Sequence, residues 1–377
     1  MKRRKSRPVR VRHLTIGGDA PISVQTMTKC DTRDVQEVLR QIRALEEAGA
    51  DLVRLAVPNM EAAEALKEIR KGTDMPLVAD IHFDYRLALK ALEAGVDKLR
   101  LNPGNIGGRD RVAAVVREAR ARGVPIRIGV NAGSLEEEIL EKYGYPTAEG
   151  LVESALRHVA ILEDMDFRDI VISVKASDVR MMIDAYRLLA EKCDYPLHLG
   201  VTEAGTPFTG TIKSAVGIGT LLADGIGDTI RVSLAGDAVE EVKVAWEILK
   251  SLNLRTRGVN IIACPSCGRV QIDLVKIARE VEERLRHIDV PLNVAVMGCV
   301  VNGPGEAAEA DVALFGGKGV GMLVVDGQMV RKMTEDEMVD VLVAKVEEMA
   351  AELKASGEAE RRGYQRRHAR QAARQEG

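Results

Sequence analysis

Residues 76–103, PLVADIHFDYRLALKALEAGVDKLRLNP, carry the pattern that decides the fold. Residues 76–81 and residues 98–103 are two short apolar runs with the composition of β-strands. Between them apolar residues recur three and four positions apart, as on one face of a helix, and Gly95 stands where a helix C-cap is expected. The stretch therefore predicts a strand–helix–strand unit.

The same unit recurs along most of the chain. The strand-like runs are residues 22–27, 52–57, 76–81, 98–103, 125–131, 170–176, 196–203 and 228–234. Helical stretches such as residues 34–48 separate them, and an additional helix is predicted at 134–140 with Ser134 as its N-cap. Eight such units predict an α/β protein with an N-terminal (β/α)8 TIM barrel. A doubly wound open sheet is the alternative, but residues 26–30 lack its glycine fingerprint.

After about residue 255 the pattern changes. Strands are predicted at 259–263, 292–297, 312–315 and 321–325, with helices at 273–286 and 335–354. We therefore expect a barrel domain at 1–254 and a smaller α+β domain at 255–355. A basic tail at 356–377 is expected to be disordered.

Composition narrows the classes of function. The chain has 377 residues, 29% of them charged, with a formal net charge of −3, which gives no general attraction to nucleic acid. No apolar run of about 18 residues indicates a membrane span. Residues 1–12 are basic without a following apolar stretch, so we expect frayed, solvated residues rather than a secretory signal. Five cysteines argue against a disulfide framework and for the cytoplasm.

Basic residues interrupt five of the apolar strands near their C-terminal halves. They are Arg54, Arg100, Arg127, Lys175 and Arg231. Burying an unpaired cation costs several kcal/mol. Internal ion pairing with Asp80 and Glu203 is the structural alternative, but two acids do not neutralise five bases. Because barrel active sites lie at the C-terminal strand ends, these side chains indicate a site for an anion with at least two charges.

Other polar residues share these strand ends. Asn131, Thr202 and Ser233 are candidate binding residues, and Asp80 and His82 lie nearby in the pattern. Glu203 is a candidate general acid or base, or alternatively a residue that only orients an arginine. The glycine-rich residues 102–108 and residues 213–215 are candidate phosphate loops.

Three of the cysteines fall close together in the second domain. Cys264 and Cys267 form a CxxC motif, and Cys299 follows another strand-like run. A [4Fe–4S] cluster, a structural zinc ion and metal-free thiol chemistry are the alternatives, and the absence of a second CxxC favours the cluster. The glycine–proline turn before Glu306 can bring its carboxylate back as a fourth ligand, with Cys30 as another candidate.

Several long motifs resemble one known family, the 4-hydroxy-3-methylbut-2-enyl diphosphate synthases, in its bacterial two-domain form. The motifs are residues 22–28 (ISVQTMT), 102–105 (NPGN), 129–135 (GVNAGSL), 225–233 (GIGDTIRVS), 264–269 (CPSCGR) and 297–306 (MGCVVNGPGE). The resemblance covers residues 10–350 or so. It implies reductive ring opening of 2-C-methyl-D-erythritol 2,4-cyclodiphosphate, with loss of water, in the non-mevalonate isoprenoid pathway.

The resemblance also implies a cofactor, partners and a set of site residues. It implies a [4Fe–4S] cluster on Cys264, Cys267, Cys299 and Glu306, reduced by ferredoxin or flavodoxin, in a homodimer. Substrate-binding positions would be Arg54, Arg100, Arg127, Asn131, Lys175, Thr202, Arg231 and Ser233, with Glu203 and Glu306 catalytic. A non-redox barrel lyase or transferase with a structural zinc domain is the alternative function. Nucleic-acid and membrane partners are not expected.

Overall fold

The computed structural model describes residues 2–299, 303–317 and 319–357. The chain divides into two compact units, one ending at Arg255 and a second beginning at Thr256. The basic stretch 358–377, which the sequence predicts to be disordered, lies outside the described residues.

The first unit is a barrel of parallel strands. The strands are β3 (Ser23–Met27), β4 (Leu52–Ala56), β5 (Leu77–Asp80), β6 (Lys98–Arg100), β7 (Ile126–Asn131), β8 (Ile170–Lys175), β9 (His198–Leu199) and β10 (Thr229–Ile230). From β3 to β8 each strand pairs in parallel with the next one in sequence, β9 pairs with β10, and β10 also pairs with β3. A parallel bridge between Ile172 and Leu197 joins β8 to the segment that enters β9 and closes the ring. The predicted TIM barrel is confirmed.

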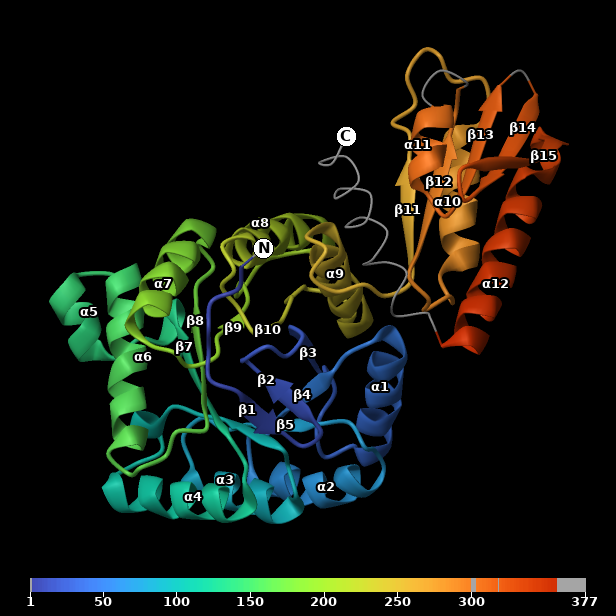
Figure 1. Ribbon diagram of the computed structural model, residues 1–377. Helices are drawn as coiled ribbons and strands as arrows, with labels where there is room; N and C mark the ends of the chain where they lie inside the picture. Colours follow the sequence, from blue (N-terminus) through green and yellow to red (C-terminus); the bar gives the residue numbers. More distant parts are fainter. Residues whose placement is uncertain (1, 300–302, 318, 358–377) are drawn as a thin grey trace. The chain divides into compact units, whose positions relative to one another are not determined.

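Helices surround the barrel, as Figure 1 shows. They are α1 (Val35–Ala48), α2 (Met60–Lys71), α3 (Tyr85–Ala94), α4 (Arg109–Arg122), α6 (Ala148–Glu163), α7 (Val179–Lys192), α8 (Pro207–Ala223) and α9 (Ala238–Ser251). The C-cap predicted at Gly95 is confirmed, because this residue ends α3 with a left-handed φ of 91°. Glycine is needed at that end because side chains rarely adopt a positive φ.

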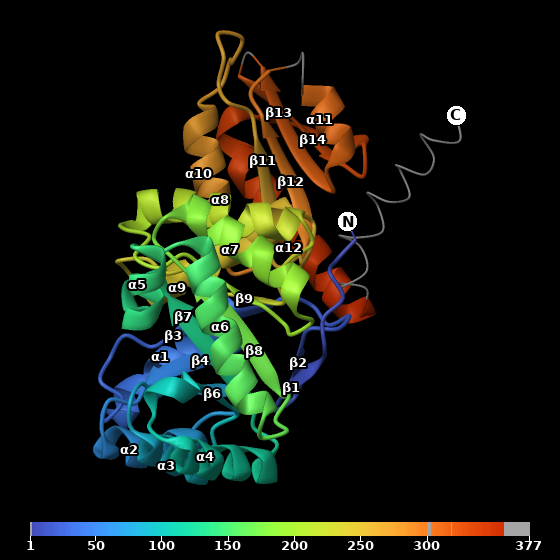
Figure 2. The same ribbon diagram turned by 90° about the vertical axis from the view of Figure 1, so that its left-hand side faces the viewer.

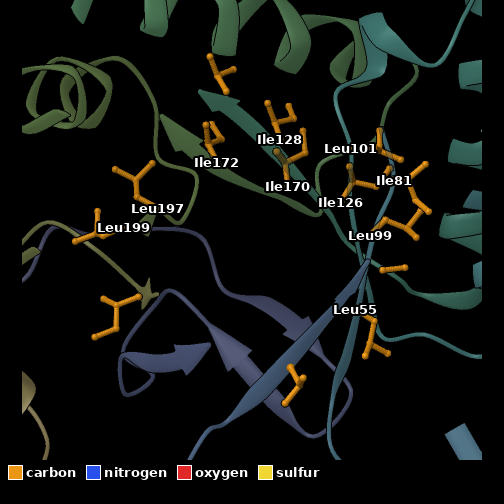
Figure 3. Close-up of a cluster of buried hydrophobic side chains, with 14 of the residues drawn as sticks. Leu55, Ile81, Leu99, Leu101, Ile126, Ile128, Ile170, Ile172, Leu197 and Leu199 are labelled. Atoms are coloured by element: carbon orange, nitrogen blue, oxygen red, sulfur yellow. The ribbon is translucent and has the colours of Figure 1, made fainter. Parts of the chain in front are cut away.

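Strand residues alternate between the two faces of the barrel wall. The outward-facing residues are aliphatic, and Figure 3 shows them on neighbouring strands, for example Leu55, Leu99 and Ile128. They belong to the large buried cluster that includes the apolar faces of the helices. The inward-facing residues are mostly polar. The barrel is therefore stabilised mainly by the packing of its outward-facing aliphatic residues against the helices. Its interior is left available for a site.

A β-hairpin covers the end of the barrel at which its strands begin. Strand β1 (Val9–Val11) pairs antiparallel with β2 (Leu14–Ile16). Buried side chains of this hairpin form one cluster with Leu52, Val78 and Val171 from the barrel strands. These three residues are the inward-facing positions farthest from the C-terminal strand ends, so the hairpin forms the floor of the barrel.

The expectation that residues 1–12 are frayed is wrong for the residues described. Arg3 pairs with the buried carboxylate of Asp228 at 3.2 Å, and the Arg4 guanidinium donates to the carbonyl of Cys193 at 2.7 Å. The backbone N–H of Arg4 also donates to the carbonyl of Gly225 at 2.8 Å. Basic composition indicated solvation, whereas these arginines satisfy carboxylate and carbonyl acceptors at the start of β10 and β9.

The additional helix of the fifth unit is present but shifted. Residues Ala132–Ser134 form a 3-10 turn, and α5 (Glu137–Tyr143) begins after Glu136. Ser134 is therefore not the N-cap, and its hydroxyl lies 3.5 Å from the carbonyl of Asn131. Strands β9 and β10 are also shorter than predicted, because only two residues of each form ladder pairs.

The second unit is a mixed sheet covered by helices. Its strands, in spatial order, are β11 (Val259–Ala263), β12 (Leu292–Met297), β13 (Val312–Gly317), β14 (Val320–Val325) and β15 (Gln328–Thr334). Helices α10 (Leu274–Leu285) and α12 (Met338–Ser356) pack against one face, and α11 (Gly303–Glu309) covers the other (Figure 2). Strand β15 and α11 were not predicted. No helix in the described part of the chain is both long and apolar enough to cross a membrane.

The floor hairpin provides a test of the barrel's construction. Changing Ile16, which is fully buried, to alanine should lower the free energy of unfolding by about 2–4 kcal/mol through lost burial and a residual cavity. Thr15→Ala, at the exposed neighbouring position, should change it by less than about 0.5 kcal/mol. Urea denaturation of both variants measures the difference, and equal effects would contradict a packed floor.

Candidate active site

A cavity of about 200 Å³ opens at the C-terminal ends of the barrel strands. Its lining residues are Arg54, Asp80, His82, Arg100, Arg127, Asn131, Lys175, Thr202, Arg231 and Ser233. All eight residues proposed from the sequence for substrate binding are among them. The volume is below the roughly 300–1,000 Å³ of sites for drug-sized ligands, so the cavity suits a compact metabolite.

Asp80 is the carboxylate around which the cavity's cations are arranged. Its two oxygens lie 3.7 Å from Nε of Arg54 and 3.4 Å from Nη1 of Arg100, and 3.5 Å from Nε2 of His82. Burial alone raises the pKa of Asp80, but the charges of Arg54 and Arg100 and the hydrogen bond from His82 outweigh it and hold the pKa well below its ordinary value. Asp80 is therefore ionised and fixes these two guanidinium groups.

Arg127 and Lys175 lie deepest among the five bases. Arg127 is 1% exposed and donates through Nη1 to the hydroxyl of Ser173 at 2.7 Å, while its Nε and Nη2 are buried without a partner. Lys175 is 4% exposed. Burial and the neighbouring positive charges lower the pKa of both side chains well below the ordinary values. Neither group forms an ion pair with a carboxylate among the described residues, so an anionic ligand would stabilise them.

Arg231 is oriented by a carboxylate on one of the helices that surround the barrel. Its Nη2 lies 3.8 Å from the buried carboxylate of Glu241 on α9, and its Nε is buried without a partner. Burial and the charge of Arg54 lower the pKa of Arg231 to about 10. Glu241 also accepts from the N–H of Leu234 at 3.0 Å and from Lys29 at 2.9 Å. Sequence patterns did not identify Glu241, because an acidic residue near a helix start is usually exposed.

The positive charge of the cavity exceeds the negative charge. Among the described residues five basic side chains line it, against the carboxylate of Asp80 in the lining and the carboxylate of Glu241 behind Arg231. Such an excess in a buried site is costly without a compensating anion. Arginine forks match the oxygens of phosphate groups, so the lining is chemically suited to an anion with at least two charges.

His82 belongs to the cavity although the sequence left its role open. Its side chain is 56% exposed, and Nδ1 lies 3.3 Å from Nη1 of Arg100. The two ring nitrogens of His82 therefore contact two different lining residues, Asp80 and Arg100. Its position two residues after Asp80, beyond the strand end, was the available sequence signal.

Glu203 lies apart from the lining residues. It follows Thr202 at the rim, is exposed, and has the left-handed backbone conformation with φ 53°. It does not pair with a cavity arginine among the described contacts, so Asp80 and Glu241 do the orienting work that the sequence assigned in part to Glu203. A positive φ at a glutamate is unusual and marks a tight turn at the rim.

The two loops predicted to bind phosphate are engaged elsewhere. The N–H groups of Gly104, Asn105 and Ile106 donate to His158 Nδ1 and to two carbonyls of their own loop. The neighbouring Asn102 instead clamps Gly129 of β7, with bonds of 3.1 and 2.9 Å in opposite directions. Lys213 lies within α8 and is not a lining residue. The expectation for these loops is corrected: the first loop positions β6 and β7.

The three clustered cysteines lie at one end of the second unit's sheet. Cys264 directly follows β11, and its N–H donates to the carbonyl of Val296 on the parallel neighbour β12 at 3.2 Å. Cys299 lies two residues beyond the end of β12. The N–H of Gln271 donates to the carbonyl of Gly298 at 3.1 Å and ties the two cysteine loops together.

Arg269 makes this sheet end suitable for thiolates. Its backbone and side-chain N–H groups bond to Cys267 and lower the pKa of that thiol, and its charge also interacts with Cys264 and Cys299. Three sulfur donors with a shared cation fit the chemistry of an iron–sulfur ligand set. Among the described residues, however, no group of three or more His, Cys, Asp or Glu side chains is arranged to hold a metal ion.

The other candidate ligands differ in what the structure shows. Glu306 lies within α11, and its side chain is outside the described residues. Cys30 is half-buried against the barrel core of the first unit, and burial raises its pKa. Burial likewise raises the pKa of Cys193, whose Sγ lies 3.5 Å from the carbonyl of Leu189. These two thiols are therefore less thiolate-like than Cys267.

Together, the barrel with a cationic mouth and the sheet with three cysteines define an enzyme for an anionic metabolite. Comparison with known proteins specifies the class. Residues 6–246 match the family model described as the GcpE TIM-barrel domain, and residues 260–348 match the GcpE protein C-terminal domain.

Characterised relatives extend the similarity over nearly the whole chain. A protein of Symbiobacterium thermophilum named 4-hydroxy-3-methylbut-2-en-1-yl diphosphate synthase (flavodoxin) is 76% identical over 95% of this chain and 96% of its own length. Relatives with the same name from Geobacter sulfurreducens and Geobacillus kaustophilus are 62% and 59% identical, over 92% and 93% of this chain and 99% and 94% of their own lengths. The chain belongs to the GcpE family of 4-hydroxy-3-methylbut-2-enyl diphosphate synthases. The resemblance found in the sequence is confirmed, and with it an oxidoreductase.

Removing the carboxylate at the centre of the cavity tests the charge balance. Asp80→Asn should lower the free energy of unfolding by about 3 kcal/mol at neutral pH, because it leaves Arg54 and Arg100 buried without their partner. Inorganic diphosphate should restore part of that loss. Since the folded-state pKa of Asp80 is depressed, its contribution is complete above the ordinary aspartate pKa and is lost as the pH falls through the lower folded value.

Chemical denaturation with and without diphosphate measures both effects. Asp184→Asn, which removes an exposed partner of Arg180, is the matched control and should change the stability by less than about 0.5 kcal/mol. If diphosphate stabilises the control and Asp80→Asn equally, Asp80 does not balance the charge of the cavity.

Proposed function

We propose that this chain converts 2-C-methyl-D-erythritol 2,4-cyclodiphosphate to (E)-4-hydroxy-3-methylbut-2-enyl diphosphate by a two-electron reductive ring opening with loss of water. The observation that supports this most is the cavity with five bases and a single lining carboxylate, on a chain whose close relatives carry the name of that activity. A cyclic diphosphate has one ionised oxygen on each phosphorus, which is the charge that such a cavity requires.

The lining residues have distinct tasks in this proposal. Arg54 and Arg100 stand in fixed positions on either side of Asp80, while Arg127 and Arg231 present buried N–H groups without partners. These groups would bind the phosphate oxygens, with Lys175 adding charge from below. Asn131, Thr202 and Ser233 line the same cavity and would bind the hydroxyl groups of the carbon chain.

The cations also favour the reaction itself. When the ring opens, the carbon–oxygen bond to one phosphate breaks, and that phosphate oxygen leaves with additional negative charge. Guanidinium groups that are already in place stabilise this charge more than they stabilise the substrate, which lowers the barrier. Water leaves only after a hydroxyl group receives a proton. His82, which contacts Asp80, and Glu203 at the rim are the candidate donors.

The electrons require a cofactor. We propose that Cys264, Cys267, Cys299 and Glu306 hold a [4Fe–4S] cluster, supported by the sulfur donor set and the cation of Arg269 at one sheet end. When bound, such a cluster supplies electrons one at a time. Arg269 would favour the ionised thiols needed for its assembly.

The electron donor and the oligomeric state are inferred from the relatives and the family. The relatives' name specifies flavodoxin, so reduced flavodoxin is the proposed electron donor, with ferredoxin as the alternative. We also propose a homodimer, from family resemblance. No disulfide joins two cysteines among the described residues, which suits the reducing cytoplasm where we expect the enzyme to act.

Anaerobic turnover with a chemical reductant tests the proposal. The reconstituted protein should show broad visible absorption and convert the cyclic diphosphate to the linear diphosphate, as followed by phosphorus NMR. Arg231→Met should raise KM by about tenfold or more because it removes a buried phosphate donor, whereas Arg187→Met, which removes an exposed partner of Asp224, should leave KM unchanged.

Two results would overturn this assignment. A colourless protein with stoichiometric zinc and no reductive turnover would favour the non-redox alternative. An unchanged KM in Arg231→Met would return Arg231 to a structural role.

A further inference from the structure

Lys98 is a fully buried lysine inside the barrel that the proposed function does not use. It lies two residues before Arg100 on β6, so both side chains face inward, and Lys98 stands about 7 Å farther from the barrel mouth. Its Nζ donates a hydrogen bond of 3.2 Å to the side-chain oxygen of Gln25 on β3, which is a neutral residue.

The surroundings of Lys98 are apolar or positive. Lys98 pairs with Val78 across the β5–β6 ladder, and Val78 belongs to the apolar floor cluster. The charges that act on its ammonium group are those of Arg127 and Arg54, both positive, whereas the Asp80 carboxylate acts on Arg100 and Arg127. His198 on β9 is also fully buried, and neither of its ring nitrogens has a hydrogen-bond partner among the described residues.

These surroundings disfavour a charged Lys98 in the empty protein. Burial first, and then the positive charges of Arg127 and Arg54, lower the pKa of Lys98 well below its ordinary value. The same causes, with Lys98 among them, lower the pKa of His198. A doubly charged anion in the cavity above would reverse the local field, because it neutralises Arg54 and Arg127 and attracts a proton to the amine.

We propose that Lys98 is a positioning residue that takes up a proton when the cyclic diphosphate binds in the cavity above it. The added positive charge then attracts the phosphate from the position below Arg127. This inference rests on the proposed function for the identity of the anion. Lys98 differs in this from Lys175, which itself lines the cavity.

Proton uptake by Lys98 fixes the direction in which substrate affinity changes with pH. The pKa of Lys98 is higher in the complex than in the empty protein, so binding consumes a fraction of a proton from solution. Affinity is therefore strongest at low pH and falls as the pH rises through the pKa of Lys98 in the complex. Each unit by which binding raises that pKa strengthens the binding of substrate by tenfold at a pH below both values.

Calorimetric titration of the full chain with the cyclic diphosphate, without reductant, measures the uptake directly. The binding heat is recorded in several phosphate-free buffers that differ in their heat of ionisation, between about pH 7 and about pH 9. The slope against the buffer heat gives the number of protons taken up. The two phosphates of the substrate are each singly and strongly acidic, so the protons are taken up by the protein.

Three variants complete the test. Lys98→Met removes the amine with little change of length, and Lys98→Gln keeps a hydrogen-bond donor for Gln25 in case the first variant folds poorly. Both should take up fewer protons than the natural chain, bind roughly tenfold more weakly at the lower pH, and show a flatter dependence of affinity on pH. Lys71→Met, at an exposed lysine paired with Glu68, should behave as the natural chain does.

The outcomes separate the two proposals. Unchanged proton uptake and an unchanged pH dependence in both Lys98 variants would overturn the role of Lys98 while leaving substrate binding intact. No binding heat for the natural chain would instead contradict the proposed function.

Discussion

The structure depends on an excess of positive charge held inside a closed barrel. Arg54, Arg100, Arg127, Lys175 and Arg231 face one cavity that a single carboxylate lines. An arrangement of this kind opposes folding, because each buried cation loses its hydration and repels the others. It persists because the barrel wall is stabilised on its outer side, where aliphatic strand residues pack against the ring of helices.

Two carboxylates fix the orientation of three of these arginine side chains. Asp80 holds Arg54 and Arg100 from within the cavity, and Glu241 holds Arg231 from the first turn of α9. Asn102 fixes the ends of β6 and β7 relative to each other through Gly129. The guanidinium groups are therefore positioned before a ligand arrives, so that little reorganisation is needed when negative charge develops during ring opening.

The barrel and the cavity residues could be predicted from the sequence because they follow regular rules. Strand periodicity identifies which residues face inward, and a base that interrupts an apolar run is costly anywhere except at a site. The residues that were missed act through contacts distant in sequence. Glu241 reaches Arg231 across a helix–strand connection, and Arg3 reaches Asp228 over the whole length of the barrel domain. Local pattern also did not reveal that Glu203 adopts a left-handed backbone conformation, with φ 53°, outside the residues that line the cavity.

The most direct measurement of the central claim compares two ligands that share a carbon skeleton and differ in charge. The affinity of the full chain for 2-C-methyl-D-erythritol 2,4-cyclodiphosphate should exceed its affinity for uncharged 2-C-methyl-D-erythritol by at least about a thousandfold, since each buried charge-assisted contact contributes roughly 1.5–3 kcal/mol. Affinities within about tenfold of each other would show that the cations are balanced within the protein and that the cavity does not require an anion.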